Sequence, residues 1–220
     1  PTTVCSIRGT EFTVAVTDGA DSRVDLEEGR LEVRNPYGRV DINEGERADI
    51  ALAEEPARAL DATDTQSWQA SRNADFRSNP GPQGERFSRY MGKFRDNSAG
   101  QSTQIKNYRG RMNRLSREGE DGLKQANDDL DRLDGEIRDD MFLNRASSSS
   151  IDAVVGDFQA SSANMFRTYS RLKREADRIA DVQQRNFQAL AAVREAYRKA
   201  YEQIKGSHQE SVEGMRESLK

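Results

Sequence analysis

Apolar residues recur at alternating intervals of four and three from Ile151 to Ile204, and this pattern constrains the fold more than any other feature of the sequence. Its positions are Ile151, Val155, Phe158, Ser162, Met165, Tyr169, Leu172, Ala176, Ile179, Gln183, Asn186, Leu190, Val193, Tyr197, Ala200 and Ile204. Such a seam packs one face of an α-helix against a partner helix, as in a coiled coil. No Gly or Pro lies from Asp157 to Lys205, which predicts one helix of about 54 residues, or ~80 Å at 1.5 Å per residue.

A helix this long is stable only when packed along its length, and an upstream segment offers the partner. Its apolar residues follow the same spacing: Ile105, Tyr108, Met112, Leu115, Leu123, Ala126, Leu130, Leu133, Ile137 and Met141. Two glycines, at 119 and 122, allow close helix approach or a bend, and we favour the bend. The serine-rich stretch 145–150 separates the two patterns, and Ser150 can cap the second helix. The sequence therefore predicts a long antiparallel, coiled-coil-like helical hairpin over residues 101–220, with its tip near residue 148.

This hairpin leaves the end of its second helix without a partner. Gln183 and Asn186 are amides at seam positions, and they either select the register or mark where the partner helix ends. In the second case an apolar stripe is exposed, formed by Leu190, Val193, Tyr197, Tyr201 and Ile204. An exposed stripe of this kind indicates an interaction site. We predict that it binds a protein partner or mediates self-association; alternatively, an aromatic helix at 85–95 folds back over it.

The segment 56–100 is predicted to connect the hairpin to the first part of the chain. Asp61, Asp64 and Thr65 can cap a helix that carries Trp68 and runs to about Arg77. We expect Trp68 to pin this helix onto the N-terminal module, with a sugar-stacking platform as the alternative. Two breaks are predicted, at residues 79–84 and 96–100, on either side of a short aromatic helix.

Residues 1–55 alternate apolar and polar side chains in runs of four to seven, separated by glycines. This pattern predicts short strands with one buried face. Asp18-Gly19 and Asn35-Pro36-Tyr37-Gly38 are hairpin turn signals. Glu-Gly precedes a strand at Gly29 and again at Gly45, and each glycine permits a positive backbone dihedral at a corner. We expect a small all-β roll, sandwich or solenoid-like module, segregated from the helices in an α+β fold.

Three motifs in this module resemble the FecR domain of bacterial envelope proteins. They begin with Arg8-Gly9-Thr10-Glu11-Phe12, continue with Glu28-Gly29-Arg30-Leu31-Glu32-Val33, and end with Val40-Asp41-Ile42-Asn43-Glu44-Gly45-Glu46. They look like the family's RGTxF, EGxVxV and VxLxxGE elements in the same order. The resemblance covers about a quarter of the chain and singles out Arg8, Gly9, Thr10, Phe12, Gly29 and Gly45.

The resemblance implies a non-catalytic binding or relay module outside the cytoplasm of a Gram-negative or related bacterium. Iron-signal regulators of this family carry an anti-sigma segment and a transmembrane helix before the domain, and a receptor-binding region after it. This chain continues into helices instead, so it looks more like a periplasmic or surface scaffold that contacts an envelope component. The alternatives are a signal-relay module of an iron-transport and sigma-factor system, and a glycan- or peptidoglycan-binding module. Because the chain begins with Pro1, we expect an export signal or anchor to have been removed.

Charge and motif content argue against other classes of function. Residues 1–60 hold 7 Lys/Arg against 13 Asp/Glu, which disfavours nucleic-acid binding by the β module. In the helical part the two signs interleave, which is typical of a solvated helix face. His208 is the single histidine, and no phosphate loop, nucleophile motif or metal-ligand spacing accompanies it. The sequence therefore predicts a protein that is not an enzyme, has no cofactor or metal, and has no membrane-spanning segment within these residues.

Overall fold

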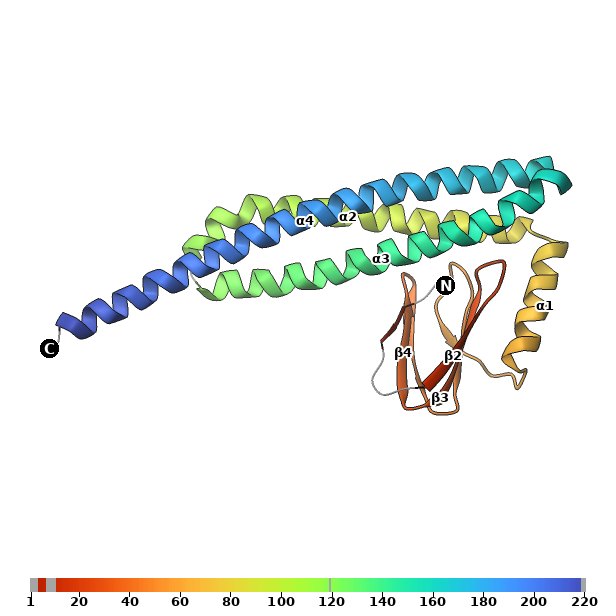
Figure 1. Ribbon diagram of the computed structural model, residues 1–220, viewed down its shortest axis with the longest axis horizontal. Coiled ribbons are helices and arrows are strands. Elements are labelled where there is room, and N and C mark those ends of the chain that lie inside the picture. The colour runs from red at the N-terminus through yellow and green to blue at the C-terminus, as the bar shows by residue number, and fades with distance from the viewer. Residues whose placement is uncertain (1–3, 7–10, 119, 219–220) are drawn as a thin grey trace. The chain divides into compact units, whose positions relative to one another are not determined.

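The computed structural model describes residues 4–6, 11–118 and 120–218 (Figure 1). It confirms the predicted α+β fold class, because all strands precede all helices. The chain divides into two compact units. The first unit comprises Pro1–Asp96 and Asp139–Asp181, and the second comprises Asn97–Arg138 and Val182–Lys220. The predicted segment boundaries at residues 55 and 100 therefore do not coincide with the division into units.

In the part of the N-terminal module that the structure describes, there are seven short strands: β1 (Val4–Ser6), β2 (Glu11–Val16), β3 (Ser22–Glu28), β4 (Arg30–Asn35), β5 (Gly38–Asn43), β6 (Arg47–Ile50) and β7 (Ala57–Arg58). They belong to two antiparallel sheets, one ordered β1-β4-β5 and the other β2-β3-β6-β7. Both sheets contribute to one buried core: Val24, Leu26, Leu31, Val33, Ile42, Ala48 and Ile50. Of the three β architectures expected from the sequence, the module is therefore a small sandwich.

The turns of the module follow the residues that the sequence singles out. Asp18-Gly19 lies in the β2–β3 hairpin, and Pro36-Tyr37 connects β4 to β5. Asn35 fixes the second turn because its Oδ1 accepts hydrogen bonds from the backbone N–H of Tyr37, at 2.8 Å, and of Gly38. Gly29 and Gly45 have φ values of 93° and 77°. The predicted positive dihedral at both Glu-Gly corners is confirmed.

Among the described residues, four helices follow: α1 (Thr65–Ser78), α2 (Gly81–Glu118), α3 (Glu120–Ser161) and α4 (Ala163–Ser218). The predicted start of α1 is confirmed, since the Asp64 side chain accepts a hydrogen bond from the Ser67 N–H. The break after α1 is confirmed at Asn79 and Pro80, but α2 already begins at Gly81.

Two predicted interruptions are wrong. The chain stays helical through residues 96–100, within α2, and through residues 145–150, within α3. The serine run is accommodated because the hydroxyls of Ser147, Ser149 and Ser150 donate to carbonyls one turn earlier in the same helix. Ser150 is therefore not a helix cap. The turn comes instead at Ser162, whose Oγ accepts a 3.4 Å hydrogen bond from the Met165 N–H.

The antiparallel hairpin is formed by α3 and α4, and its tip is at residue 162 rather than near 148. In the first unit Lys173 pairs with Asp152 across the two helices at 3.2 Å. In the second unit Arg194 of α4 pairs with Asp131 of α3. The upstream segment 101–141 is not one helix arm, because α2 ends at Glu118 and α3 begins at Glu120.

The first unit has a core that joins the β module to the helices. Its buried residues are Ala20, Leu52, Ala53, Phe76, Phe87, Tyr90, Met91, Phe94, Leu143, Ile151, Val154, Phe158, Tyr169, Leu172, Ala176 and Ile179. They come from the β module and from all four helices. The aromatic segment 85–95 packs here and contacts Tyr169 through Phe87, with ring centroids 6.0 Å apart.

The second unit buries most of the stripe that was expected to be exposed. Leu190, Val193 and Tyr197 are each at most 2% exposed, while Tyr201 and Ile204 are half-buried. Tyr197 contacts Tyr108 of α2, because its hydroxyl donates to the Tyr108 carbonyl at 2.9 Å. The prediction of an exposed stripe is therefore wrong. With the hairpin tip at residue 162, α3 reaches along this part of α4, so the partner helix does not end in the 180s.

The seam amides are internal to the second unit. Gln183 and Asn186 are both buried. Asn186 accepts a 2.6 Å hydrogen bond from the Ser102 hydroxyl and donates a 2.8 Å bond to the Ser98 carbonyl. Of the two interpretations offered by the sequence, this geometry favours selection of the α2–α4 register, because only one alignment satisfies both bonds.

Candidate functional site

Arg-x-Asp occurs on two paired strands of the β module, in β3 as Arg23-Val24-Asp25 and in β6 as Arg47-Ala48-Asp49. Antiparallel pairing sets Arg23 opposite Asp49 and Asp25 opposite Arg47. Arg23 binds Asp49 in a two-bond fork, with Nε–Oδ1 at 2.6 Å and Nη2–Oδ2 at 2.8 Å. Arg47 donates to Asp25 in the neighbouring pair. Because Val24 and Ala48 face the sandwich core, the charged pairs lie on the other face of the sheet.

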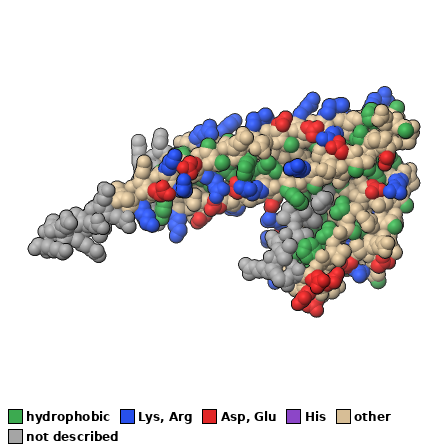
Figure 2. Space-filling model, in the orientation of Figure 1, with side chains coloured by type: hydrophobic (Ala, Val, Ile, Leu, Met, Phe, Trp, Pro, Cys, Tyr) green, Lys and Arg blue, Asp and Glu red, His purple; other side chains and the backbone are tan. Residues whose placement is uncertain are grey.

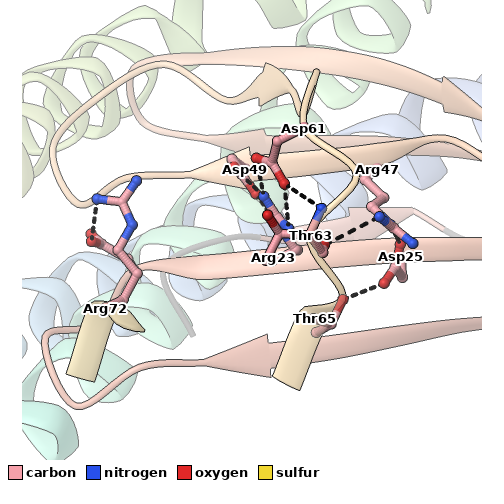
Figure 3. A network of polar contacts seen from close by, with 9 residues as sticks. Arg23, Asp25, Arg47, Asp49, Asp61, Thr63, Thr65 and Arg72 are labelled. Carbon is pink, nitrogen blue, oxygen red and sulfur yellow. Dashed lines mark hydrogen bonds and ion pairs between the residues drawn. The ribbon is translucent and has the colours of Figure 1, made fainter. Parts of the chain in front are cut away.

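The segment leading into α1 completes this charged cluster (Figure 3). Asp61 accepts from Arg23 Nη2 at 2.8 Å, and the Thr63 carbonyl accepts from Arg23 Nη1 at 2.9 Å. The Thr65 hydroxyl donates to Asp25. The Arg23 side chain is 0% exposed, whereas Asp49 and Asp61 are 28% and 49% exposed. The guanidinium is thus the buried centre of the cluster, and the carboxylates surround it.

Trp68 of α1 packs over the same guanidinium. The Arg23 Cζ lies 5.0 Å from the Trp68 ring centroid, and the Arg72 Cζ lies 6.0 Å from it. Trp68 is 7% exposed. The predicted role of Trp68 in pinning α1 to the β module is therefore confirmed, and a buried ring cannot serve as the sugar-stacking platform considered as the alternative.

The charges of the cluster stabilise one another. Hydrogen bonding to Asp49 raises the pKa of Arg23 further above its ordinary value. Hydrogen bonding to Arg23 lowers the pKa of Asp61 to about 2. Arg23 and Asp61 therefore stay ionised at neutral pH and bound to each other, which suits a fixed attachment point rather than proton transfer.

A second attachment point joins the β2–β3 hairpin to the helices of the first unit. The buried carboxylate of Asp21 accepts a 2.8 Å hydrogen bond from the Leu52 N–H. Gln83 of α2 donates to Asp21 Oδ1 at 3.3 Å, and Arg86 Nη1 lies 3.9 Å from Asp21 Oδ2. The β module is therefore held by one charged cluster at α1 and by another at α2.

Among the described residues, those singled out by the FecR resemblance do not lie together in one site. Arg8, Gly9 and Thr10 lie outside the residues that the structure describes. Phe12 is half-buried and packs against the sandwich core. Gly29 and Gly45 occupy separate corners, before β4 and before β6.

A surface groove of about 590 Å³ lies between α3 and α4 in the second unit. Tyr197 and Tyr201 of the predicted stripe line it, together with Leu123 and Ala191. Charged residues of both signs, including Asp128 and Arg198, form its rim. Leu190, Val193 and Ile204 of the predicted stripe are not among the residues that line this groove.

The described parts of the chain contain no group of three or more His, Cys, Asp or Glu residues placed to hold a metal ion. Within these same parts, no helix has the length and apolar character needed to cross a membrane. No family model, curated protein or solved structure matches the chain. The resemblance to the FecR domain therefore stays a prediction from the sequence motifs.

Sequence reasoning missed Arg23, Asp49 and Asp61 as a cluster. A signal was present, because two strands that each carry Arg-x-Asp become mutually complementary when they pair antiparallel. The register that pairs them and the approach of Asp61 are tertiary features, and only the structure supplies them.

Proposed function

We propose that this chain is a non-enzymatic interaction protein of the bacterial cell envelope, in which a FecR-like β module binds a protein partner and the helices act as its scaffold. The observation that carries the proposal is the firm attachment of the module. Arg23 joins it to the start of α1, Asp21 joins it to α2, and a continuous apolar core joins it to all four helices. The order of the FecR-like motifs supports the envelope assignment.

The stripe from Leu190 to Ile204 is not proposed as an assembly surface. Leu190, Val193 and Tyr197 are almost completely buried in the second unit, which leaves little of the stripe for a partner to contact. Partner recognition is assigned to the β module instead, where Val14 of β2 is a large apolar side chain that is 40% exposed.

Photo-crosslinking in the bacterium that encodes the chain tests this assignment. A photoreactive amino acid is placed at Val14, and a matched control places it at Phe142 of α3, which is 54% exposed. We expect the protein in the periplasmic or surface fraction, with a discrete adduct from position 14 and none from position 142. A cytosolic protein, or an adduct only from position 142, would contradict the proposal.

Signal relay is the second candidate, and the shared core of the first unit favours it. Ala20 and Leu52 of the β module pack in the same cluster as Leu172 and Ala176 of α4, so a change in the module would reach the helices. Hydrogen exchange of α4 residues 163–181, measured with and without the crosslinked partner, separates the two candidates. Relay predicts altered exchange in these helix amides, whereas a passive scaffold predicts exchange that changes only in the β module.

A further inference from the structure

Four arginines follow one line along α4 in the first unit: Arg167, Arg171, Arg174 and Arg178. Each lies two residues after a seam position, so it is rotated by about 200° away from the packed face of the helix. All four are exposed, whereas the seam residues Tyr169, Leu172 and Ala176 are buried. We call these four residues the arginine stripe.

Between Arg167 and Arg178 the acidic residues, Glu175 and Asp177, lie on the flanks of α4 and are paired there, and Asp181 follows three residues after Arg178. Glu175 accepts from Arg95 of α2 at 3.4 Å. Asp177 pairs with Lys173 at 3.0 Å, and Lys173 also reaches Asp152 of α3. Within the described residues, no arginine of the stripe forms an ion pair. Charges that interleave along the sequence are therefore separated on the helix, and the outer face is basic.

The beginning of α4 adds to this positive surface. No acidic residue occupies the first turn of α4, so no carboxylate there offsets the charge of Arg167. Figure 2 shows Lys and Arg side chains spaced along the outer edge of the long helices, with carboxylates lying deeper between them. Like charges three and four residues apart repel each other, so an anion that bridges them would relieve that repulsion.

We propose that the arginine stripe binds a linear acidic polysaccharide whose anionic groups lie along α4. The stripe spans about 16 Å, and successive guanidinium groups are separated by roughly 4.5–6 Å along the helix axis. That interval is comparable to one sugar unit, so a chain with one carboxylate per sugar offers a matching row of charges. Arginine suits such a ligand because its planar fork binds carboxylates through two parallel hydrogen bonds.

Other anionic partners fit the stripe less well. A flat anionic membrane would also approach the flanking carboxylates of Glu175 and Asp177, and the line carries no apolar side chain to insert. A single-stranded nucleic acid would find no aromatic side chain on the line for its bases to stack on. An acidic protein surface would offer only exposed ion pairs, each of which contributes little, whereas a polyanion also releases counterions.

The inference concerns α4 and is independent of partner binding by the β module. Binding of a fluorescein-labelled polygalacturonate oligomer to the whole chain, followed by anisotropy at 50 and 200 mM NaCl, tests it. If the contacts behave as those of a flexible polyanion do, four of them predict a loss of affinity of about 50-fold between these salt concentrations.

Three variants locate the binding. R167Q/R171Q/R174Q/R178Q should lose most of the affinity and most of the salt dependence. R167K/R171K/R174K/R178K keeps the charge but loses the forked hydrogen bonds, so it should bind more weakly than the parent chain and more tightly than the glutamine variant. The matched control, K106Q/R109Q/R145Q/K205Q, removes four exposed charges outside the stripe and should bind like the parent chain. Circular dichroism of each variant verifies that the helices are intact.

The proposal is overturned if the parent chain does not bind polygalacturonate, or if the control variant loses as much affinity as the stripe variant. It is also overturned if vesicles containing phosphatidylglycerol, or an oligothymidylate of equal charge, bind more tightly than polygalacturonate through the same four residues. Selective loss in the glutamine variant, with intermediate affinity in the lysine variant, supports it.

Discussion

Replacing Asp49 by Asn should destabilise the first unit more than removing the arginine to which it is bound. The side chains have nearly equal shape, so the change removes a charge and leaves packing almost unaltered. Arg23 would then keep its charge at 0% exposure with only Asp61 to balance it, and Asp61 is itself 49% exposed. Leaving a buried charge without its partner typically costs about 3–5 kcal/mol.

The reciprocal change, Arg23→Met, should lower the free energy of unfolding by less, on the order of 1–3 kcal/mol. It removes the buried charge, and the two carboxylates left behind are exposed enough to be solvated by water. Adding Asp49→Leu to Arg23→Met should cost less than the sum of the single changes, because the second change no longer leaves a charge unpaired. Asp41→Asn is the matched control, since Asp41 and its partner Arg30 are both largely exposed, and it should cost less than about 1 kcal/mol.

Urea unfolding followed by Trp68 fluorescence and by helical circular dichroism gives these values. Trp68 is the single tryptophan and lies over Arg23, so its emission reports on the cluster directly. Asp49→Asn should also lower the melting temperature by about 6–20 °C. A cost for Asp49→Asn no larger than that for Asp41→Asn, or smaller than that for Arg23→Met, would refute the view that Arg23 is the buried centre of the attachment.

Four further predictions follow from the structure. Asn186→Ala should lower the free energy of unfolding by about 1–3 kcal/mol, because Ser98 and Ser102 lose their buried partner; thermal melts followed by circular dichroism measure this. The lowered pKa of Asp61 implies stability that is present above about pH 4 and is lost as pH falls toward 2; the slope of unfolding free energy against pH should decrease in this window in Asp61→Asn. Burial raises the pKa of Tyr169 above its ordinary 10.0. The neutral side chain should therefore contribute to the free energy of unfolding below about pH 10, and this contribution should be lost as pH rises further. Urea melts at pH 9 and pH 11 measure the difference. Gly45→Ala should destabilise by about 1–2 kcal/mol because φ is +77° there, whereas Gly100→Ala, in open space within α2, should stabilise by about 0.5–1 kcal/mol; paired urea melts decide both signs.

The sequence predicts those parts of the fold that depend on local chemistry. Turn residues such as Asn35 and the glycines at 29 and 45 specify their own backbone geometry, and Asp64 caps α1 through a nearby amide. The four/three spacing predicts the buried faces of the long helices. These features were predictable because each depends on residues only a few positions apart.

Helix ends that depend on tertiary packing were not predictable from the sequence. The serine run at 147–150 reads as a turn, yet the hydroxyls of Ser147, Ser149 and Ser150 donate to carbonyls of the helix itself. Ser98 and Gly100 read as a break, but the helix continues because Ser98 is buried and its carbonyl is bound by Asn186. Misplacing the tip at 148 instead of 162 led directly to the wrong expectation that Leu190 and Tyr197 are exposed.

The charged cluster shows the same division between local and tertiary information. Each Arg-x-Asp is readable in its own strand, but the pairing of β3 with β6 and the return of Asp61 bring three charged segments together over long sequence distances. Likewise, Arg174 and Glu175 lie on different faces of α4 because successive residues of a helix are rotated relative to each other. The ion-pair partners of the flanking residues Glu175 and Lys173 come from α2 and α3, which only the structure places beside α4.

The central claim is that the β module and the helices of the first unit form one body, and native-state hydrogen exchange tests it most directly. Amides of Leu31 and Ile42 in the sandwich are compared with those of Leu172 and Ala176 in α4, over increasing but sub-denaturing urea concentrations. The account predicts that both sets exchange through the same opening, with equal free energy and equal dependence on urea. Sandwich amides that exchange through a smaller, separate opening while the α4 amides stay protected would contradict it.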